Sequence, residues 1–223
     1  MFVVGRFGFT TVTVTNSTLS GNRSDDEGGA LDVVNASVAL TNTTLSDNRA
    51  DTGGALSVVG GAANSVSIVG ASIVRNVAER FGSLSVERGL DFEIHNSLIV
   101  GNSDVRRTFS GSSVVESASF ALGSRSSNNL INDPDLISDV SHGENGNIIG
   151  DGLGNSLGFG RILMPLADNG GSSLTHALVD NSPAIDAGNN DEAEGILLFD
   201  QRGDGFGRLV GEAVDIGALE RQS

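Results

Sequence analysis

The residues best suited to chemistry form a column of acidic side chains at one position of a repeat. Each of them follows a repeated asparagine by three positions: Asp25, Asp51 and Glu79. If the repeats stack, these carboxylates lie about 5 Å apart, and a Ca²⁺ ion bound between them would relieve their repulsion. The alternative is a solvated acidic edge that keeps the protein soluble, which is the usual role of such charges. We therefore expect no resident cofactor and retain Ca²⁺ at this column as the second hypothesis.

The basic residues and the histidines give weaker signals, and no catalytic residue is assigned. Arg106 and Arg107 could pair with the acidic column or recognise a carboxylated sugar, but they also suit an irregular surface turn. The three histidines, His95, His142 and His176, do not have the spacing of metal ligands. Because apolar residues flank His176, we expect it to form internal hydrogen bonds.

A segment rich in Asp and Asn, residues 186–191, has the composition of a calcium-binding loop. It lacks the ligand spacing and the terminal Glu of an EF-hand. Asp and Asn side chains also bond readily to nearby backbone N–H groups, so the segment predicts an Asx-rich turn.

The acidic column follows from a repeat in the first half of the chain. Four asparagines mark the repeat, at intervals of 26, 28 and 26 residues: Asn22, Asn48, Asn76 and Asn102. An aliphatic residue precedes each asparagine by three positions: Leu19, Leu45, Ile73 and Ile99. A Gly-Gly-Ala-Leu sequence follows the first two asparagines, at 28–31 and 53–56. A period of this length is typical of stacked structural units.

Each unit contains short strands, because apolar and hydroxyl residues alternate at 12–15, 38–41 and 66–68. Equivalent residues can stack in register only if these strands run parallel. The repeat therefore predicts an all-β fold, a right-handed parallel β-helix, the hand being the usual one for parallel crossovers. The four asparagines would form a ladder at a turn, where Asn tolerates a left-handed backbone and amides bond between rungs. The Gly-Gly pairs would lie at a tight corner.

The repeat resembles the Gly-Gly-Ala-(Ile/Leu) and Phe-x-x-Asn repeats of chlamydial polymorphic outer-membrane proteins. The Asn half of that signature is present at residues 18–22 and 44–48, with Leu where those proteins prefer Phe. The repeat is also similar to the wider pectate-lyase-like β-helix superfamily. These resemblances specify the fold more closely than the function.

The chain changes character at about residue 132. Residues 1–132 carry the rungs, and residues 1–5 align with the middle of a repeat at 56–60, so we expect further rungs of a longer protein to precede them. Residues 133–223, the C-terminal module, are rich in Gly, Asp and Asn, which predicts a turn-rich unit with few regular elements. We expect this module to cover part of the coil's C-terminal end.

The C-terminal module contains a series of motifs, at residues 165–171, 174–178, 182–188, 200–203 and 214–220. This series resembles the choice-of-anchor Q domain of bacterial surface proteins. The resemblance implies an exported β-helix protein that a C-terminal sorting signal holds at the bacterial cell surface. It also accounts for the first two residues of Arg202-Gly203-Asp204, so we expect no receptor role for this integrin-type tripeptide.

Composition excludes several partners. The formal net charge is −15, which argues against nucleic acid and against anionic lipid, because both need basic patches. No apolar run is long enough to span a membrane, so we expect no direct membrane insertion. Trp and Tyr are absent, and these are the rings that sugar-binding enzymes use as platforms.

The sequence therefore favours an exported bacterial cell-surface segment with a structural or adhesive role and no enzymatic activity. Its expected partner is a polysaccharide or another cell-surface ligand, contacted through many weak bonds along the rungs. The alternative is a polysaccharide lyase or glycoside hydrolase of the pectate-lyase-like superfamily. That alternative requires a groove in which Asp, Glu or Arg side chains of neighbouring rungs converge.

Overall fold

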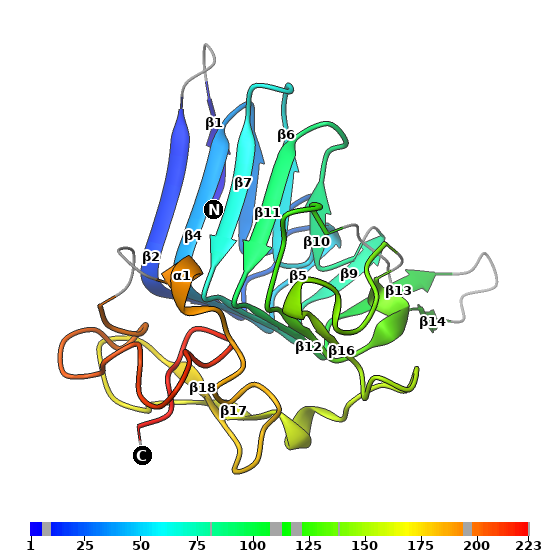
Figure 1. Cartoon of the computed structure of the whole chain (residues 1–223). Coiled ribbons are helices and arrows are strands. Elements are labelled where there is room, and N and C mark those ends of the chain that lie inside the picture. The colour runs from blue at the N-terminus through cyan, green and yellow to red at the C-terminus, as the bar shows by residue number, and fades with distance from the viewer. Residues whose placement is uncertain are drawn as a thin grey trace.

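The chain folds as a parallel β-solenoid with a turn-rich C-terminal module (Figure 1). The structure is a computed structural model, and it describes residues 1–5, 10–80, 82–107, 113–116, 122–137, 139–193 and 198–222. Three sheets surround the core, and each sheet takes strands from successive repeats. The predicted fold, an all-β parallel β-helix, is confirmed.

Two of the sheets have four strands each. The first runs in the order β1 (Phe2–Val4), β3 (Leu31–Val34), β6 (Leu56–Val59) and β10 (Leu84–Val86), with parallel pairing throughout. The other contains β5 (Arg49–Thr52), β9 (Val77–Arg80) and β13 (Ser103–Arg107) in parallel, followed by β14 (Ser113–Glu116), which is antiparallel to β13.

The remaining large sheet has two limbs, because its two longest strands, β2 (Thr11–Ser20) and β4 (Ser37–Ser46), are shared between them. The first halves of β2 and β4 pair onward with β7 (Ser65–Val69) and β11 (Asp91–His95), and we call this the open limb. The second halves pair onward with β8 (Ser72–Val74), β12 (Leu98–Val100), β15 (Leu130–Ile131) and β16 (Ile148–Ile149), and we call this the docked limb.

Inward-facing side chains form ladders along the coil. In the open limb the register aligns Val14, Leu40, Ile68 and Ile94. In the docked limb it aligns Leu19, Leu45, Ile73, Ile99 and Ile131. Both ladders follow the predicted register. The interior members of the second ladder are fully buried, and each contributes about 1.5–3 kcal/mol of hydrophobic stabilisation.

The left-handed residues that turn the coil are not the ladder asparagines. At that corner the positive φ belongs to the preceding residue, at Gly21, Asp47, Arg75 and Gly101. The prediction that the ladder asparagines adopt the left-handed backbone was therefore wrong. Their side chains point into the coil, and the residue before each of them has the positive φ. A second corner, between the two limbs, does place asparagines in the left-handed region: Asn16, Asn42, Asn96 and Asn128, with Gly70 on the third rung.

The Gly-Gly pairs lie at a third, tight corner. Gly28 and Gly53 have φ values of 58° and 62°, in the left-handed region. A Cβ on Gly29 would lie 2.0 Å from the carbonyl oxygen of Gly54 on the next rung. The predicted reason for these glycines, a tight turn in close contact with its neighbour, is therefore confirmed.

The C-terminal module begins as an extension of the coil. Leu136, Ile137 and Ile149 pack into the coil's main core, and β16 continues the docked limb beyond the expected boundary at residue 132. Residues 133–149 therefore close the C-terminal end of the coil. This first part includes the 3-10 turns η1 (Pro134–Leu136) and η2 (Glu144–Gly146).

The rest of the module runs back along the docked limb (Figure 1). It contains η3 (Phe159–Arg161), the antiparallel pair β17 (Leu163–Ala167) and β18 (Thr175–Leu178), and the short helix α1 (Asn190–Ala193). A second core joins it to the coil, in which Leu98, Val100 and Leu130 pack with Leu163 and Ile216. Within the described residues, no helix has the length and apolar character that a membrane crossing requires.

Candidate ligand-binding face

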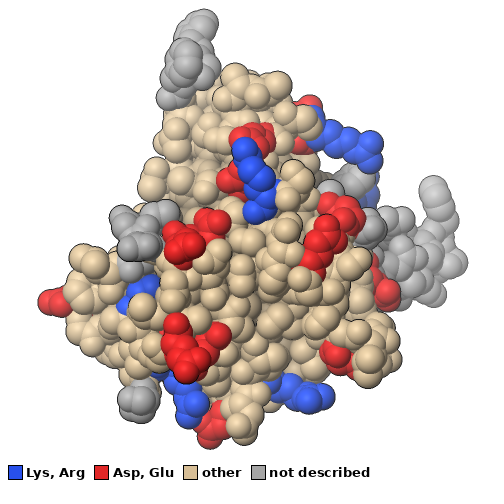
Figure 2. Space-filling model, viewed as in Figure 1, with Lys and Arg blue, Asp and Glu red and all other residues tan. Residues whose placement is uncertain are grey.

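The open limb presents a broad face of small side chains to solvent. Its outward positions on the first three rungs hold hydroxyl residues and one alanine, all exposed or half-buried, and one buried valine, Val69. The exposed and half-buried positions are Thr11, Thr13, Thr15, Ser37, Ala39, Thr41, Ser65 and Ser67. None of these side chains is charged. In Figure 2 the surface over β2, β4 and β7 is correspondingly almost free of red and blue. Parallel pairing spaces the rungs by about 4.8 Å, so the hydroxyl groups form a regular array.

Charges appear only at the last rung of this face. On β11 the outward residues are Asp91, Glu93 and His95, aligned with Ser65, Ser67 and Val69. The Arg125 guanidinium forms ion pairs with both Asp91 and Glu93. The two carboxylates raise the pKa of Arg125. A hollow of about 750 Å³ adjoins this pair and is lined by Glu87–Phe92 and Leu122–Arg125.

His95 lies beside this charged pair and is almost buried, with 6% of its surface exposed. Its Nδ1 lies 2.9 Å from the Ser127 hydroxyl, and the Glu93 and Glu192 carboxylates are each 3.8 Å from a ring nitrogen. His95 and Ser127 occupy facing positions of neighbouring rungs, since they form a parallel bridge. In a Ser–His–Glu triad for nucleophilic catalysis, the histidine would hydrogen-bond to both the serine hydroxyl and the glutamate carboxylate. Here only the serine hydroxyl lies within hydrogen-bonding distance of His95. This arrangement therefore positions His95 rather than activating Ser127.

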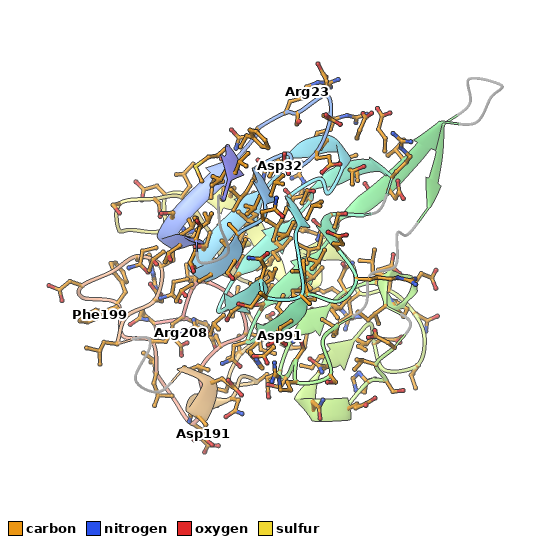
Figure 3. All side chains as sticks on the ribbon, turned by 90° about the horizontal axis from the view of Figure 1, so that it is seen from above. Arg23, Asp32, Asp91, Asp191, Phe199 and Arg208 are labelled. Atoms are coloured by element: carbon orange, nitrogen blue, oxygen red, sulfur yellow. The ribbon has the colours of Figure 1, made fainter. Side chains whose placement is uncertain are left out.

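The acidic column lies on another side of the coil, where Figure 3 shows Arg23 far from Asp91. Each of its carboxylates has an arginine nearby: Arg23 is 3.3 Å from Asp25, Arg80 is 3.8 Å from Asp51, and Arg49 is 3.2 Å from Glu79. These guanidinium groups balance the negative charge of the carboxylates, which is the role that the calcium hypothesis assigned to Ca²⁺. In the part of the chain that the structure describes, no three acidic, His or Cys side chains form a metal-binding group.

The four repeated asparagines form one hydrogen-bonded column. The side-chain Nδ2 groups of Asn22, Asn48 and Asn76 donate to the Oδ1 of the next asparagine at 2.9, 2.9 and 3.0 Å. The backbone N–H of each donor residue bonds to the same oxygen. The second amide hydrogen of Asn48, Asn76 and Asn102 reaches a backbone carbonyl of the preceding rung. Each buried amide is therefore satisfied, so the column serves the structure of the coil.

Polar side chains on the docked limb bind the C-terminal module. Gln201 accepts a hydrogen bond from the Thr44 hydroxyl and donates to Thr18. The ring Nδ1 of His176 donates to the Met164 carbonyl at 2.8 Å, and its Nε2 lies 2.9 Å from the Ser46 hydroxyl. The predicted internal role of His176 is thus confirmed. Burial lowers the pKa of His176, which favours the neutral ring.

The asparagines of the second corner bind the module's backbone. Asn42 donates to the carbonyl of Phe199 at 2.7 Å, and Asn96 exchanges two hydrogen bonds with Asn189. Asn128 donates to the carbonyl of Ala187. These docking residues are absent from the sequence predictions. The sequence does mark this corner, because Asn16, Asn42 and Asn96 keep the repeat spacing, and Gly70 occupies the equivalent position between Asn42 and Asn96.

The module's motifs meet in a buried charge cluster. Asp200 binds Arg202 through paired hydrogen bonds and also accepts the N–H of Glu220. Arg208, which is 1% exposed, donates to the carbonyl of Asp215 and lies 3.7 Å from the Glu220 carboxylate. Because the Arg202 guanidinium is buried in this cluster, the Arg202-Gly203-Asp204 tripeptide does not present the cation that a receptor would recognise.

Two smaller predictions have different outcomes. The N–H of Asp191 bonds to the Asn189 side chain, and Asp186 has a φ of 52°, which confirms an Asx-rich turn at 186–191. Arg106 and Arg107 lie on β13, but their side chains fall outside the described residues.

No protein-family model matches this chain, and neither a curated protein nor a solved structure shows significant similarity to it.

Proposed function

We propose that this chain is a non-enzymatic segment of an exported bacterial cell-surface protein, and that its open limb binds an extended polysaccharide. The observation that carries the proposal is the uncharged array of small hydroxyl side chains across β2, β4 and β7. An extended chain of sugars can lie flat on such a face and exchange hydrogen bonds with successive rungs. Each bond is weak, and affinity would arise from their number.

The charged last rung gives this face a distinct end. Asp91 and Glu93 can accept hydrogen bonds from sugar hydroxyls, while Arg125 compensates one of their two negative charges. The hollow beside them offers room for a terminal or branching sugar. A neutral or weakly acidic polysaccharide suits this arrangement better than a strongly anionic one, because the whole chain carries a net charge of −15.

A screen of immobilised neutral and acidic polysaccharides tests the proposal. Ser67 lies at the centre of the open limb and is partly exposed, so Ser67→Arg should weaken binding about tenfold or more by lifting the ligand off the face. Ser141→Arg is the matched control, because Ser141 is exposed on the segment that closes the coil's C-terminal end. The proposal fails if no polysaccharide binds or if both variants bind equally well.

The alternative is a polysaccharide lyase or hydrolase, and one observation favours it. Asp91, Glu93 and Arg125 converge on the open limb beside the hollow. A hydrolase needs two carboxylates that face the sugar, whereas here both engage the same guanidinium. We therefore expect no new reducing ends or unsaturated products from any bound polysaccharide. Cleavage that disappears in Asp91→Asn but persists in Ser141→Arg would establish the enzyme instead.

A further inference from the structure

The hollow beside Asp91 lies at the corner where the first sheet meets the open limb. It is lined by β10, the turn at 87–90, the first residues of β11 and residues 122–125. Its volume of about 750 Å³ lies within the range of about 300–1,000 Å³ that is usual for small-molecule sites. The hollow therefore has room for one sugar together with a substituent.

The floor of the hollow is apolar, because half-buried members of two inward-facing ladders line it. Val58 and Val66 are 0–1% exposed, whereas the residues aligned with them on the next rung, Val86 and Phe92, are only half-buried. Leu90 lies in the turn between these two and is also half-buried. All three side chains line the hollow, so an apolar group of a ligand can remove further apolar surface from water there.

The guanidinium group of Arg88 adds hydrogen-bond donors to the lining of the hollow. Arg88 is exposed, and within the described residues its side chain has no ion pair and no hydrogen bond. Arg125 lines the same hollow but is already paired with two carboxylates. Ser85 and Ser124 contribute hydroxyl groups. The hollow thus combines an apolar floor with guanidinium N–H groups that remain available to an acceptor on a ligand.

The charges around the hollow distinguish between two kinds of sugar substituent that combine an acceptor with an apolar part. Three carboxylates and two guanidinium groups lie in or beside the hollow: Glu87, Asp91, Glu93, Arg88 and Arg125. A substituent with a carboxylate would add a fourth negative charge and would be repelled. An acetyl group is neutral, its carbonyl oxygen accepts hydrogen bonds, and its methyl group suits an apolar floor. The acetyl group therefore fits this hollow better.

We propose that the hollow selects an acetylated sugar of the bound polysaccharide: the acetyl carbonyl accepts a hydrogen bond from Arg88, and the methyl group packs on the apolar floor. This selection rests on polysaccharide binding by the open limb and adds the chemical group that the site recognises. The first outward column of the open limb leads to the hollow: Thr11, Ser37, Ser65 and Asp91. A chain of sugars along this column therefore brings one sugar into the hollow at the last rung.

Two matched pairs of probes test this selection on the full chain. Chito-oligosaccharides and cello-oligosaccharides of equal length share their linkage and differ in the acetamido group, and an O-acetylated glucomannan can be compared with the same polymer after mild alkaline deacetylation. We expect the acetylated member to bind about tenfold more tightly, and the pair that shows the preference identifies the amide or the ester. Equal binding within both pairs would overturn the selection and leave polysaccharide binding in place. If no probe binds, the proposed function fails as well.

Protein variants separate recognition of the acetyl group from binding along the open limb. Arg88→Ala should weaken the acetylated probe about tenfold and leave its unacetylated partner unchanged. Arg80→Ala is the matched control, because the Arg80 side chain is 65% exposed and lies on β9, in a different sheet. Ser67→Arg should instead weaken both members of a pair. If Arg88→Ala weakens both members equally or neither of them, Arg88 does not recognise the acetyl group and the selection is overturned.

Discussion

The two limbs of the large sheet share strands β2 and β4, and each has its own inward ladder of apolar residues, yet their outer faces have opposite environments. On the open limb the outward column Thr13, Ala39, Ser67 and Glu93 faces solvent. On the docked limb the equivalent column Thr44, Ser72, Leu98 and Leu130 is buried under the module. The repeat thus determines the interior of the coil, while the outward residues determine what each face contacts.

The docked column also changes along the coil. Thr18, Thr44 and Ser72 hold the module through hydrogen bonds, and Leu98 and Leu130 hold it through the second apolar core. The hydrogen bonds at one end of this column and the apolar contacts at the other hold the module at one position along the coil. Shifting the module by one rung would leave hydroxyl groups buried without hydrogen-bond partners. The open limb has no such gradient until its charged last rung.

The largest test of this contrast replaces one outward residue on each limb. Leu98→Ala should lower the free energy of unfolding by about 2–5 kcal/mol, because Leu98 is 1% exposed in the second core. Ser67→Ala on the open limb should change it by less than about 0.5 kcal/mol. Urea unfolding followed by circular dichroism measures both. Equal effects would mean that the module does not bury the docked limb as described.

A change of pH should act on the module side of the molecule. Burial raises the pKa of the Glu220 carboxyl from 4.5 to about 7. A raised pKa means that the folded state holds this proton more tightly, so the contribution is complete below pH 4.5 and is lost as the pH rises through about 7. We expect stability to fall by about 1–3 kcal/mol between pH 5 and pH 8.

Glu220→Gln serves as the control for this prediction, since it keeps the shape of the side chain and removes its titration. Burial also raises the pKa of Asp215, which acts in the same direction as Glu220. It lowers the pKa of His176, whose contribution is present above pH 6.5 and is lost as the pH falls through the lowered value. If the pH dependence is the same in Glu220→Gln as in the parent chain, Glu220 is not its source.

The smallest expected effect concerns the acidic column, which belongs to neither limb. Because arginines already pair with Asp25, Asp51 and Glu79, millimolar Ca²⁺ should leave the melting temperature unchanged. Asp51→Asn should alter stability by less than about 0.5 kcal/mol, as is usual for exposed ion pairs. A calcium-dependent rise in melting temperature that Asp51→Asn abolishes would restore the metal hypothesis.

The coil could be predicted from sequence because its information is local and repeated. The register of Leu19, Leu45, Ile73 and Ile99 follows directly from their spacing. The ion pairs of the acidic column could not be predicted from local sequence, because Arg49 pairs with Glu79 and Arg80 with Asp51, each on a neighbouring rung. Docking of the module could not be predicted, since Thr44 and Gln201 are 157 residues apart and no period links them.

The path of the module has a consequence for how the protein unfolds. A solenoid whose rungs touch only their neighbours can fray from an end, one repeat at a time. Here Gln201 reaches Thr18 and Thr44 on the first two rungs, while Asn189 and Ala187 reach Asn96 and Asn128 near the other end. Fraying of any one rung would break bonds to a body that all the others share. The module thereby couples rungs near both ends of the coil, so we expect this stack to unfold more cooperatively than one whose rungs touch only their neighbours.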